Sequence, residues 1–425
     1  MATENASKYI KLRPRQPTIP TNVSPTDGQS TSSTPTLVSS AFDTNEVEGE
    51  LHLSSVWRIA TDIGMTTIIH DSGIVLDLES YIVPIQLDGS TIYYFDVSHI
   101  GARGGKSTKS SATSFETVGE ISALFNTQEY TGNSAVQAIT TGFDMTDEGF
   151  MFFWRTAIAS YVDFVFTQFG LYRVQRMFVN SGGQTLQPEG VTGYNATGFD
   201  LGGGTELNSS GNTMSLVAGK RSKLFCDVLK WTGDGQTSRA IPHILETDVG
   251  FMVNIINSTN TGHNVTPTWF AGMPADEILG RTGIVTDTGT WGNTLPTSTD
   301  IYCGTGGVYD TNNNGVEYTA LIFSNNSPLQ VEVGEYTGTG LASEKILTSG
   351  PPGFLWIFGE SSLSTLHSKE VGITKSKLML NNSASGLVST QLESFDSDGF
   401  TLTDHPNVNT DGVLYRYLSI PDPNL

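Results

Sequence analysis

Hydrophobic and polar residues alternate in the first quarter of the chain in a way that predicts β-strands. The clearest line consists of Leu87, Thr91, Tyr93, Phe95 and Val97, the last three at every second position. Successive side chains of a strand point to opposite faces, so this period of two places Tyr93, Phe95 and Val97 on one buried face. Shorter apolar runs at 36–42, 55–60 and 66–70 are separated by Gly, Asp or Asn, as expected for strands joined by turns.

Three landmarks recur in the same order along the rest of the chain: an aromatic-Thr-Gly triplet, an apolar run that follows Gly-Phe, and an Asn-x-x-Gly step that leads into a last apolar run. The copies are Tyr130-Thr-Gly132, Trp231-Thr-Gly233 and Tyr336-Thr-Gly338; residues 149–154, 250–255 and 353–358; and Asn208-Ser-Ser-Gly211, Asn312-Asn-Asn-Gly315 and Asn409-Thr-Asp-Gly412. Landmarks of each kind lie about 100 residues apart, which indicates tandem copies of one domain.

These patterns predict an all-β protein, a sandwich domain followed by three tandem β-sandwich repeats. The expected divisions are a flexible N-terminal arm at 1–16, the sandwich domain at 17–117, a connector at 118–129, and repeats at 130–222, 223–327 and 328–425. The arm carries Lys8, Lys11, Arg13 and Arg15 without hydrophobic periodicity. It is expected to be either a disordered terminus or a peptide that docks on an acidic partner.

The glycine of each Asn-x-x-Gly step is predicted to close a tight turn. Gly211, Gly315 and Gly412 each stand just before an apolar run. Asn and Gly adopt the positive φ angles that a hairpin turn requires, so these three glycines are expected at equivalent structural turns.

Charge and composition exclude several classes of function. A net charge of -21 at pH 7 argues against binding nucleic acid or anionic lipid, since both need clustered Lys and Arg. Cys226 and Cys303 are the only cysteines and lie far apart in the sequence, so neither a disulfide framework nor a zinc site with paired ligands is expected. The N-terminus has no secretory pattern and no window reaches 18 apolar residues, so membrane insertion is not expected either.

Two runs of alternating oxygen side chains imitate the start of a calcium loop. They are Asp310-x-Asn312-x-Asn314-Gly315 and Asn407-x-Asn409-x-Asp411-Gly412. An EF-hand needs a Glu eleven residues after the first ligand, and that position after Asp310 is Leu321, inside an apolar run. Both runs coincide with the repeated turn, so a turn is the favoured interpretation and no metal or cofactor is expected.

Acidic clusters are the only support for an enzyme. Paired carboxylates are what a glycoside hydrolase needs, and candidates stand at Asp144, Asp147 and Glu148 and at Asp396, Asp398 and Asp404. All lie beside Gly in predicted turns, so we interpret them as solvated turn residues. No histidine motif is present, and a Ser/His/Asp triad stays open only because its members meet in space. We therefore predict no catalytic residues.

Tryptophan supplies the candidate binding residues. Trp154 and Trp356 stand in apolar runs and are expected in the core. Trp269 and Trp291 stand in Gly/Thr/Pro-rich stretches of the second repeat, where an exposed ring could stack on a sugar. Packing of these two rings within the loops is the alternative.

The stretch from 17 to 117 resembles a fibronectin type III domain. The line from Leu87 to Val97 is similar to the F strand of that family, and Trp57 is similar to its core tryptophan. Segments 24–28, 34–37, 55–62 and 113–117 resemble the variant found in bacteriophage tail and fibre proteins, although Gly89 replaces the usual proline. Residues 129–421 resemble a functionally uncharacterised β-repeat of phage virion proteins. Many members have a proline at the start of the middle strand, and only Pro351-Pro352 matches it here.

The resemblance implies a structural, non-enzymatic protein of a tailed bacteriophage virion, synthesised in the host cytoplasm. A tail-fibre or adhesion appendage that contributes to host attachment is the expected role. A capsid decoration or head-fibre protein and a carbohydrate-active enzyme on the virion are the alternatives. The expected partners are other virion proteins at the N-terminal region, a host surface glycan or protein, and further copies of the chain as a homo-oligomer.

Overall fold

The computed structural model describes most of the chain as two compact units, residues 1–119 and 120–425, which are treated separately. The described residues are 16–44, 50–89, 91–117, 121–146, 149–155, 162–169, 171, 173–176, 184–186, 190–203, 207–256, 267–280, 283–307, 309–327, 329–360, 364–370, 372, 377–379 and 390–424. Nearly all of the predicted arm, together with Asp147 and Glu148, lies outside them.

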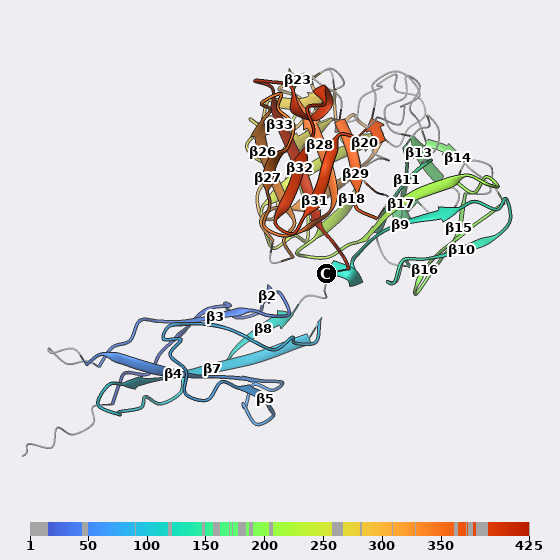
Figure 1. The fold of residues 1–425 in the computed structure, drawn as a ribbon. Helices are drawn as coiled ribbons and strands as arrows, with labels where there is room; N and C mark the ends of the chain where they lie inside the picture. Colours follow the sequence, from blue (N-terminus) through green and yellow to red (C-terminus); the bar gives the residue numbers. More distant parts are fainter. Residues whose placement is uncertain are drawn as a thin grey trace, which may run out of the picture. The chain divides into compact units, whose positions relative to one another are not determined.

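The first unit is a β-sandwich (Figure 1). Its strands are β1 (Asn22–Ser24), β2 (Gln29–Thr31), β3 (Thr36–Ser39), β4 (His52–Ala60), β5 (Ile68–Asp71), β6 (Ser80–Ile82), β7 (Thr91–Gly101) and β8 (Thr113–Thr117). One sheet has the order β1-β3-β6 and the other the order β2-β8-β7-β4-β5. Among the described strands of this unit, β2 and β8 alone pair in parallel.

The predicted alternation in β7 is confirmed by burial. Tyr93, Phe95 and Val97 lie in one core cluster with Trp57 from β4. Asp96 is on the opposite face of β7, where it forms an ion pair with Arg58 of β4. That pairing explains how a carboxylate on the outer face of a sheet is buried.

The second unit contains the three repeats. The first has η1 (Ile121–Ala123), β9 (Phe125–Thr131), β10 (Gln137–Thr140), β11 (Gly149–Arg155), β12 (Asp163–Phe166), η2 (Thr167–Phe169), β13 (Arg173–Arg176), β14 (Gln184–Leu186), β15 (Val191–Asn195), β16 (Gly198–Leu201) and β17 (Thr213–Lys220). The second has β18 (Cys226–Thr232), β19 (Arg239–Pro242), β20 (Val249–Ile256), β21 (Thr268–Phe270), β22 (Glu277–Gly280), β23 (Gly283–Thr286), β24 (Asp300–Cys303) and β25 (Glu317–Ser324). The third has β26 (Glu332–Thr337), β27 (Glu344–Leu347), β28 (Pro352–Gly359), β29 (Ser364–Ser368), β30 (Lys377–Met379), β31 (Leu392–Asp396), β32 (Gly399–Leu402), α1 (Pro406–Asn409) and β33 (Leu414–Pro421).

The three repeats have the same strand order. In each large sheet the triplet strand pairs with the last strand, which pairs with the Gly-Phe strand, giving β9-β17-β11-β12, β18-β25-β20-β21 and β26-β33-β28-β29. A small sheet accompanies each: β10-β16-β15, β19-β24 and β27-β32-β31. The predicted all-β fold with several sandwiches is confirmed. The first strand of the first repeat begins at Phe125, inside the stretch predicted as a connector.

The repeats share one aromatic core and are not separate bodies. In the first and third repeats, one face of the Gly-Phe strand packs on the small sheet, and the other face meets neighbouring repeats. Phe152 of the first repeat and Phe251 of the second lie 5.9 and 5.1 Å, by ring centroid, from Trp356 of the third. Phe150 lies 5.5 Å from Phe323, which joins the first repeat to the second. Because every pair of repeats meets in this core, the three sheets surround it.

Each large sheet has two distinct ends. At one end, the strand that carries the triplet and the Gly-Phe strand both finish, and the Asn-x-x-Gly step leads into the start of the last strand. In the first repeat, Thr131 lies opposite Thr213 at this end. We call this the turn end. At the other end, the connector end, the chain enters through η1, passes between repeats and finishes after β33, so that the C-terminus lies beside η1 (Figure 1). Phe125 packs on Phe225 and Phe354 at this end, so the connector ends of the three sheets meet.

Candidate functional site

Trp269 and Trp291 are buried, so the prediction that they form an exposed platform is wrong. They are 5% and 1% exposed. The Nε1 of Trp269 donates to the carbonyl of Met273 at 3.2 Å, and the Nε1 of Trp291 donates to that of Glu277 at 3.2 Å. The stretch that holds Trp269 is the sheet strand β21 and not a loop. Trp154 and Trp356 are buried as expected.

The aromatic-Thr-Gly triplet and the Asn-x-x-Gly step pack against each other in every repeat. We call each such pair a repeat corner. The polar atom of the aromatic ring donates to the carbonyl of the residue before the Asn: Tyr130 Oη to Leu207 at 2.6 Å, Trp231 Nε1 to Thr311 at 3.1 Å and Tyr336 Oη to Val408 at 2.7 Å. A Trp replaces Tyr in the second repeat because its indole N–H makes the same bond.

A fully buried Asn bridges the two halves of each corner. Its Oδ1 accepts from the backbone N–H of the residue that directly follows the triplet. Its Nδ2 donates to a backbone carbonyl elsewhere in the same repeat. The bonds are Asn133 N to Asn208 Oδ1 at 3.0 Å and Asn208 Nδ2 to Gly202 O at 2.8 Å; Asp234 N to Asn312 Oδ1 at 3.2 Å and Asn312 Nδ2 to Gln236 O at 3.0 Å; and Thr339 N to Asn409 Oδ1 at 2.8 Å and Asn409 Nδ2 to Leu341 O at 2.7 Å. The amide oxygens of Asn312 and Asn409 are thus used by backbone N–H groups, which favours the turn interpretation over calcium.

Glycine is needed in both halves of the corner, for two different reasons. A Cβ on Gly132, Gly233 or Gly338 would lie 2.2, 2.2 or 2.4 Å from a carbonyl oxygen of the facing step, so backbone approaches backbone there. Gly211, Gly315 and Gly412 have φ of 76°, 76° and 73° and occupy the same place in the three repeats. These angles lie in the left-handed region that residues with a Cβ adopt rarely.

Gly412→Val is expected to destabilise the second unit by about 1 kcal/mol or more, because a β-branched residue is strained at positive φ. No atom lies within 4 Å of the missing Cβ, so the cost comes from the backbone angle and not from a clash. Gly412→Asn is the matched control, because Asn tolerates this region and should lose much less. Denaturant unfolding checks both; equal stability of the Val variant and the wild type would contradict the assignment.

The acidic clusters serve local turns where the structure describes them. Asp144 Oδ1 accepts from Thr146 N at 2.8 Å, Asp396 accepts from the hydroxyls of Ser394 and Thr401, and Asp398 forms an ion pair with Lys345 at 2.6 Å. Among the described residues, no group of three or more His, Cys, Asp and Glu side chains could hold a metal ion.

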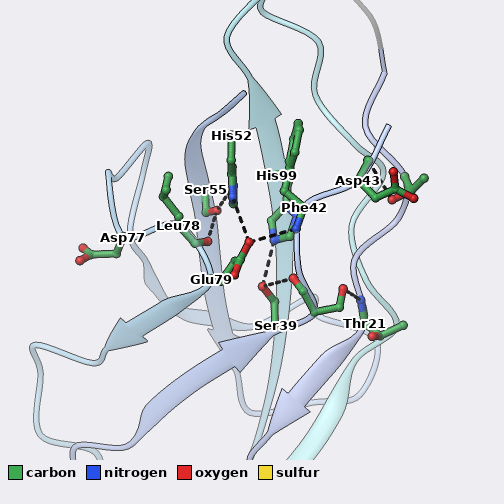
Figure 2. A network of polar contacts seen from close by, with 12 residues as sticks. Thr21, Ser39, Phe42, Asp43, His52, Ser55, Asp77, Leu78, Glu79 and His99 are labelled. Carbon is green, nitrogen blue, oxygen red and sulfur yellow. Dashed lines mark hydrogen bonds and ion pairs between the residues drawn. The ribbon is translucent and has the colours of Figure 1, made fainter. Parts of the chain in front are cut away.

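The first unit contains a polar network that the sequence patterns did not predict (Figure 2). The rings of His52 in β4 and His99 in β7 lie 4.4 Å apart, and Phe42 stacks on His52 at 4.7 Å. His99 Nε2 is 2.9 Å from Ser39 Oγ, and His52 Nε2 is 3.0 Å from Ser55 Oγ. The members come from strands distant in sequence, and the polar residues His52, Ser55 and His99 within two otherwise largely apolar strands were the available signal.

Ser55, His52 and Glu79 stand in the order of a catalytic triad, but their geometry does not suit a nucleophile. Ser55 is fully buried and its hydroxyl donates to the carbonyl of Leu78. The His52 Nδ1 to Glu79 Oε1 distance is 3.8 Å, longer than a hydrogen bond. A substrate could not reach Ser55, so we interpret the network as structural.

Burial sets the protonation state of the histidine pair. It lowers the pKa of His99 to about 4, with a smaller contribution from the neighbouring His52, and it also lowers the pKa of His52 against the opposing effect of Glu79. Both rings are therefore neutral in the folded unit at pH 7, so no charge repulsion opposes their close approach.

The first unit is expected to lose stability as the pH falls from about 6.5 to about 4. The unfolded chain binds protons on these histidines below about pH 6.5, whereas in the folded unit the pKa of His99 is about 4 and that of His52 is also lowered, so stability is complete above this window and declines within it. The loss should reach about 2–3 kcal/mol. Hydrogen exchange of β4 and β7 peptides measures it. His99→Gln should flatten the profile; an unchanged slope in that variant would contradict the assignment.

Comparison with known proteins yields distant similarities only. No family model and no curated protein matches the chain. Among solved structures, an α-L-rhamnosidase from Dictyoglumus thermophilum shares 9% identity at a TM-score of 0.24, over 96% of this chain and 48% of that one. An α-L-rhamnosidase from Streptomyces avermitilis shares 10% identity at a TM-score of 0.24, over 93% and 45%. The chain thus spans about half the length of these enzymes, and similarity at this level assigns neither fold nor activity. Within the described residues, no helix is long and apolar enough to cross a membrane.

Proposed function

We propose that the protein is a structural component of a tailed bacteriophage virion and acts as a tail-fibre or adhesion appendage in host attachment. The observation that supports this role is the arrangement of the second unit, in which one aromatic core holds three sheets whose repeat corners lie at their turn ends. Loops on such a scaffold can vary in sequence without loss of the core.

The two ends suit different partners. The chain enters the second unit at the connector end, so the first unit and its arm would bind other virion proteins, and any homo-oligomer would form there. The turn ends would face the host. With Trp269 and Trp291 buried, the candidate contacts move to the loop after each triplet, where Val136 and Leu341 are exposed in the first and third repeats.

Binding to host cells by the purified full-length protein tests this role. Because the loops carry few charges, binding should change less than about twofold between 50 and 500 mM salt. Val136→Asp and Leu341→Asp should each weaken binding several-fold. Leu347→Asp is the matched control, since Leu347 is equally exposed but lies at the far end of β27 from the corner. Equal loss in all three variants would count against the turn end.

Labelling of virions with an antibody against the second unit separates the alternatives. Label on the tail fibres or tail tip supports the proposal. Label over the head would assign the protein to capsid decoration or a head fibre, and particles without label would reject a virion role. Cleavage of host glycans by the purified protein would establish the enzyme alternative instead.

A further inference from the structure

The first unit has an open sheet edge that carries exposed aliphatic side chains. Of seventeen exposed large hydrophobic residues in the described chain, twelve lie in this unit. Three of them, Ile74, Leu76 and Leu78, stand at every second position after β5 and are 73%, 80% and 37% exposed. We call residues 74–78 the aliphatic strip. In a chain of net charge -21, a row of exposed aliphatic side chains at a sheet edge is typical of a contact surface.

The strip is attached to the sheet on one side only. Ser55 N donates to Val75 O at 2.9 Å and Val75 N donates to Ser55 O at 3.0 Å, so the strip continues along β4 on the side where β5 pairs. Val75 packs against the core, and its neighbours Ile74 and Leu76 turn their side chains to solvent.

The backbone of the strip is free on its other side. Within the described part of the chain, no group forms a hydrogen bond with the backbone N–H or C=O of Ile74 or Leu76. In an antiparallel pair, the residues that flank a bridge such as Ser55–Val75 direct these groups away from the partner strand. The edge is therefore open to one further strand.

The strip of a second copy fits this edge. Two identical strands related by a two-fold axis pair in antiparallel orientation. With the axis at Leu76, each Leu76 lies opposite Leu76 of the other copy, and each Ile74 lies opposite Leu78. The two Leu76 residues can then exchange both backbone hydrogen bonds, which uses the N–H and C=O groups that are free in the single chain.

Charge and burial favour this register over its neighbours. An axis one residue later would set Asp77 directly opposite Asp77, and like charges in that position are destabilising. An axis one residue earlier would leave Leu78 opposite Ser72. With the axis at Leu76, Asp77 lies opposite Val75, and every exposed aliphatic side chain of the strip meets another aliphatic side chain. The backbone and the side chains thus select the same register.

We infer that the aliphatic strip is a dimer interface, through which two copies of this chain join the sheets that contain β4 and β5 edge to edge. Each copy contributes only one strand, so the interface is small and we expect a dissociation constant in the micromolar range. The inference goes beyond the proposed role in host attachment, because it is argued from the first unit alone. Failure of the dimer and failure of host-cell binding are therefore separate results.

A single cysteine tests the register. Leu76→Cys should form a disulfide-linked dimer in most molecules under mild oxidation, because the two Cα atoms would lie about 5.5 Å apart. Ile74→Cys is the matched control, since residue 74 is similarly exposed but its two copies would lie about 14 Å apart, too far for a disulfide. Ile74→Cys combined with Leu78→Cys should restore the cross-link. The two native cysteines are buried and do not interfere. Equal cross-linking of the two single variants overturns the inference.

Sedimentation velocity of the full-length protein tests the interface without a cross-link. Leu76→Asp removes an aliphatic contact and sets two carboxylates face to face, so the dissociation constant of the dimer should rise about tenfold or more. Ile92→Asp should dimerise like the wild type, because Ile92 is 55% exposed but lies on β7, which has a strand on each side. Hydrogen exchange of β4 checks that all variants fold. Wild-type protein that stays monomeric at about 100 µM overturns the inference, and so does equal loss of the dimer in both variants.

Discussion

Trp356→Ala is expected to destabilise all three repeats together, by about 3–5 kcal/mol. Trp356 is fully buried, and its ring meets Phe152 of the first repeat and Phe251 of the second. Removal of the ring leaves a cavity where the three sheets join, so the loss is not confined to the repeat that carries the substitution. Hydrogen exchange followed separately in β11, β20 and β28 measures this.

Trp57→Ala is the matched control for that experiment. Trp57 is just as buried, but it lies in the core of the first unit. Its removal should accelerate exchange in β4 and β7 and leave the second unit unchanged. If Trp356→Ala affected β28 alone, the repeats would be independent domains and the shared core would be of no energetic importance.

Asn208→Ala is expected to cost the second unit about 3 kcal/mol, since it leaves buried backbone groups without partners. The Asn208 side chain is fully buried and satisfies Asn133 N, Ala135 O and Gly202 O. Asn208→Asp should be at least as harmful, because a carboxylate keeps the acceptor but cannot donate to the two carbonyls.

Asn133→Ala provides the comparison within the same corner. The side chain of Asn133 accepts only from Ala135 N in an exposed loop, and its loss should cost less than about 1 kcal/mol. Thermal or denaturant unfolding of the three variants ranks them. Similar values for Asn208→Ala and Asn133→Ala would show that the bridging Asn is not what holds the corner.

The strands and the repeated landmarks were predictable because they depend on local pattern. Period-two alternation predicted the buried face of β7, and the Asn-x-x-Gly steps predicted the three turns. Their partnership with the triplets was not predictable, since Tyr130 and Leu207 are distant in sequence and meet only through pairing of β9 with β17. The network of His52 and His99 was not predicted for the same reason.

Two features of the second unit were missed for more specific reasons. The Gly/Thr/Pro-rich context of Trp269 and Trp291 suggested exposed loops. Trp269 instead stands in β21, and although Trp291 does lie in a turn, the indole hydrogen bonds hold both rings inside the second repeat. The shared core was not predicted, although the sequence contains an indication of it. Residues 149–154 are apolar at every position and do not alternate with polar residues. Such a run is typical of a strand covered on both faces, and the second face is covered by the other repeats.

The fusion of three corners into one polypeptide has a consequence for how a surface at the turn end can diversify. In an assembly of three identical chains, every substitution appears three times, and a change that suits one contact is imposed on all. Here the loops after Tyr130, Trp231 and Tyr336 are encoded separately and already differ, as Asn133-Ser-Ala, Asp234-Gly-Gln and Thr339-Gly-Leu. If the turn end forms the binding surface proposed above, a single mutation would alter one of its three loops while the other two keep their contacts, so recognition could shift in small steps without loss of all binding at once.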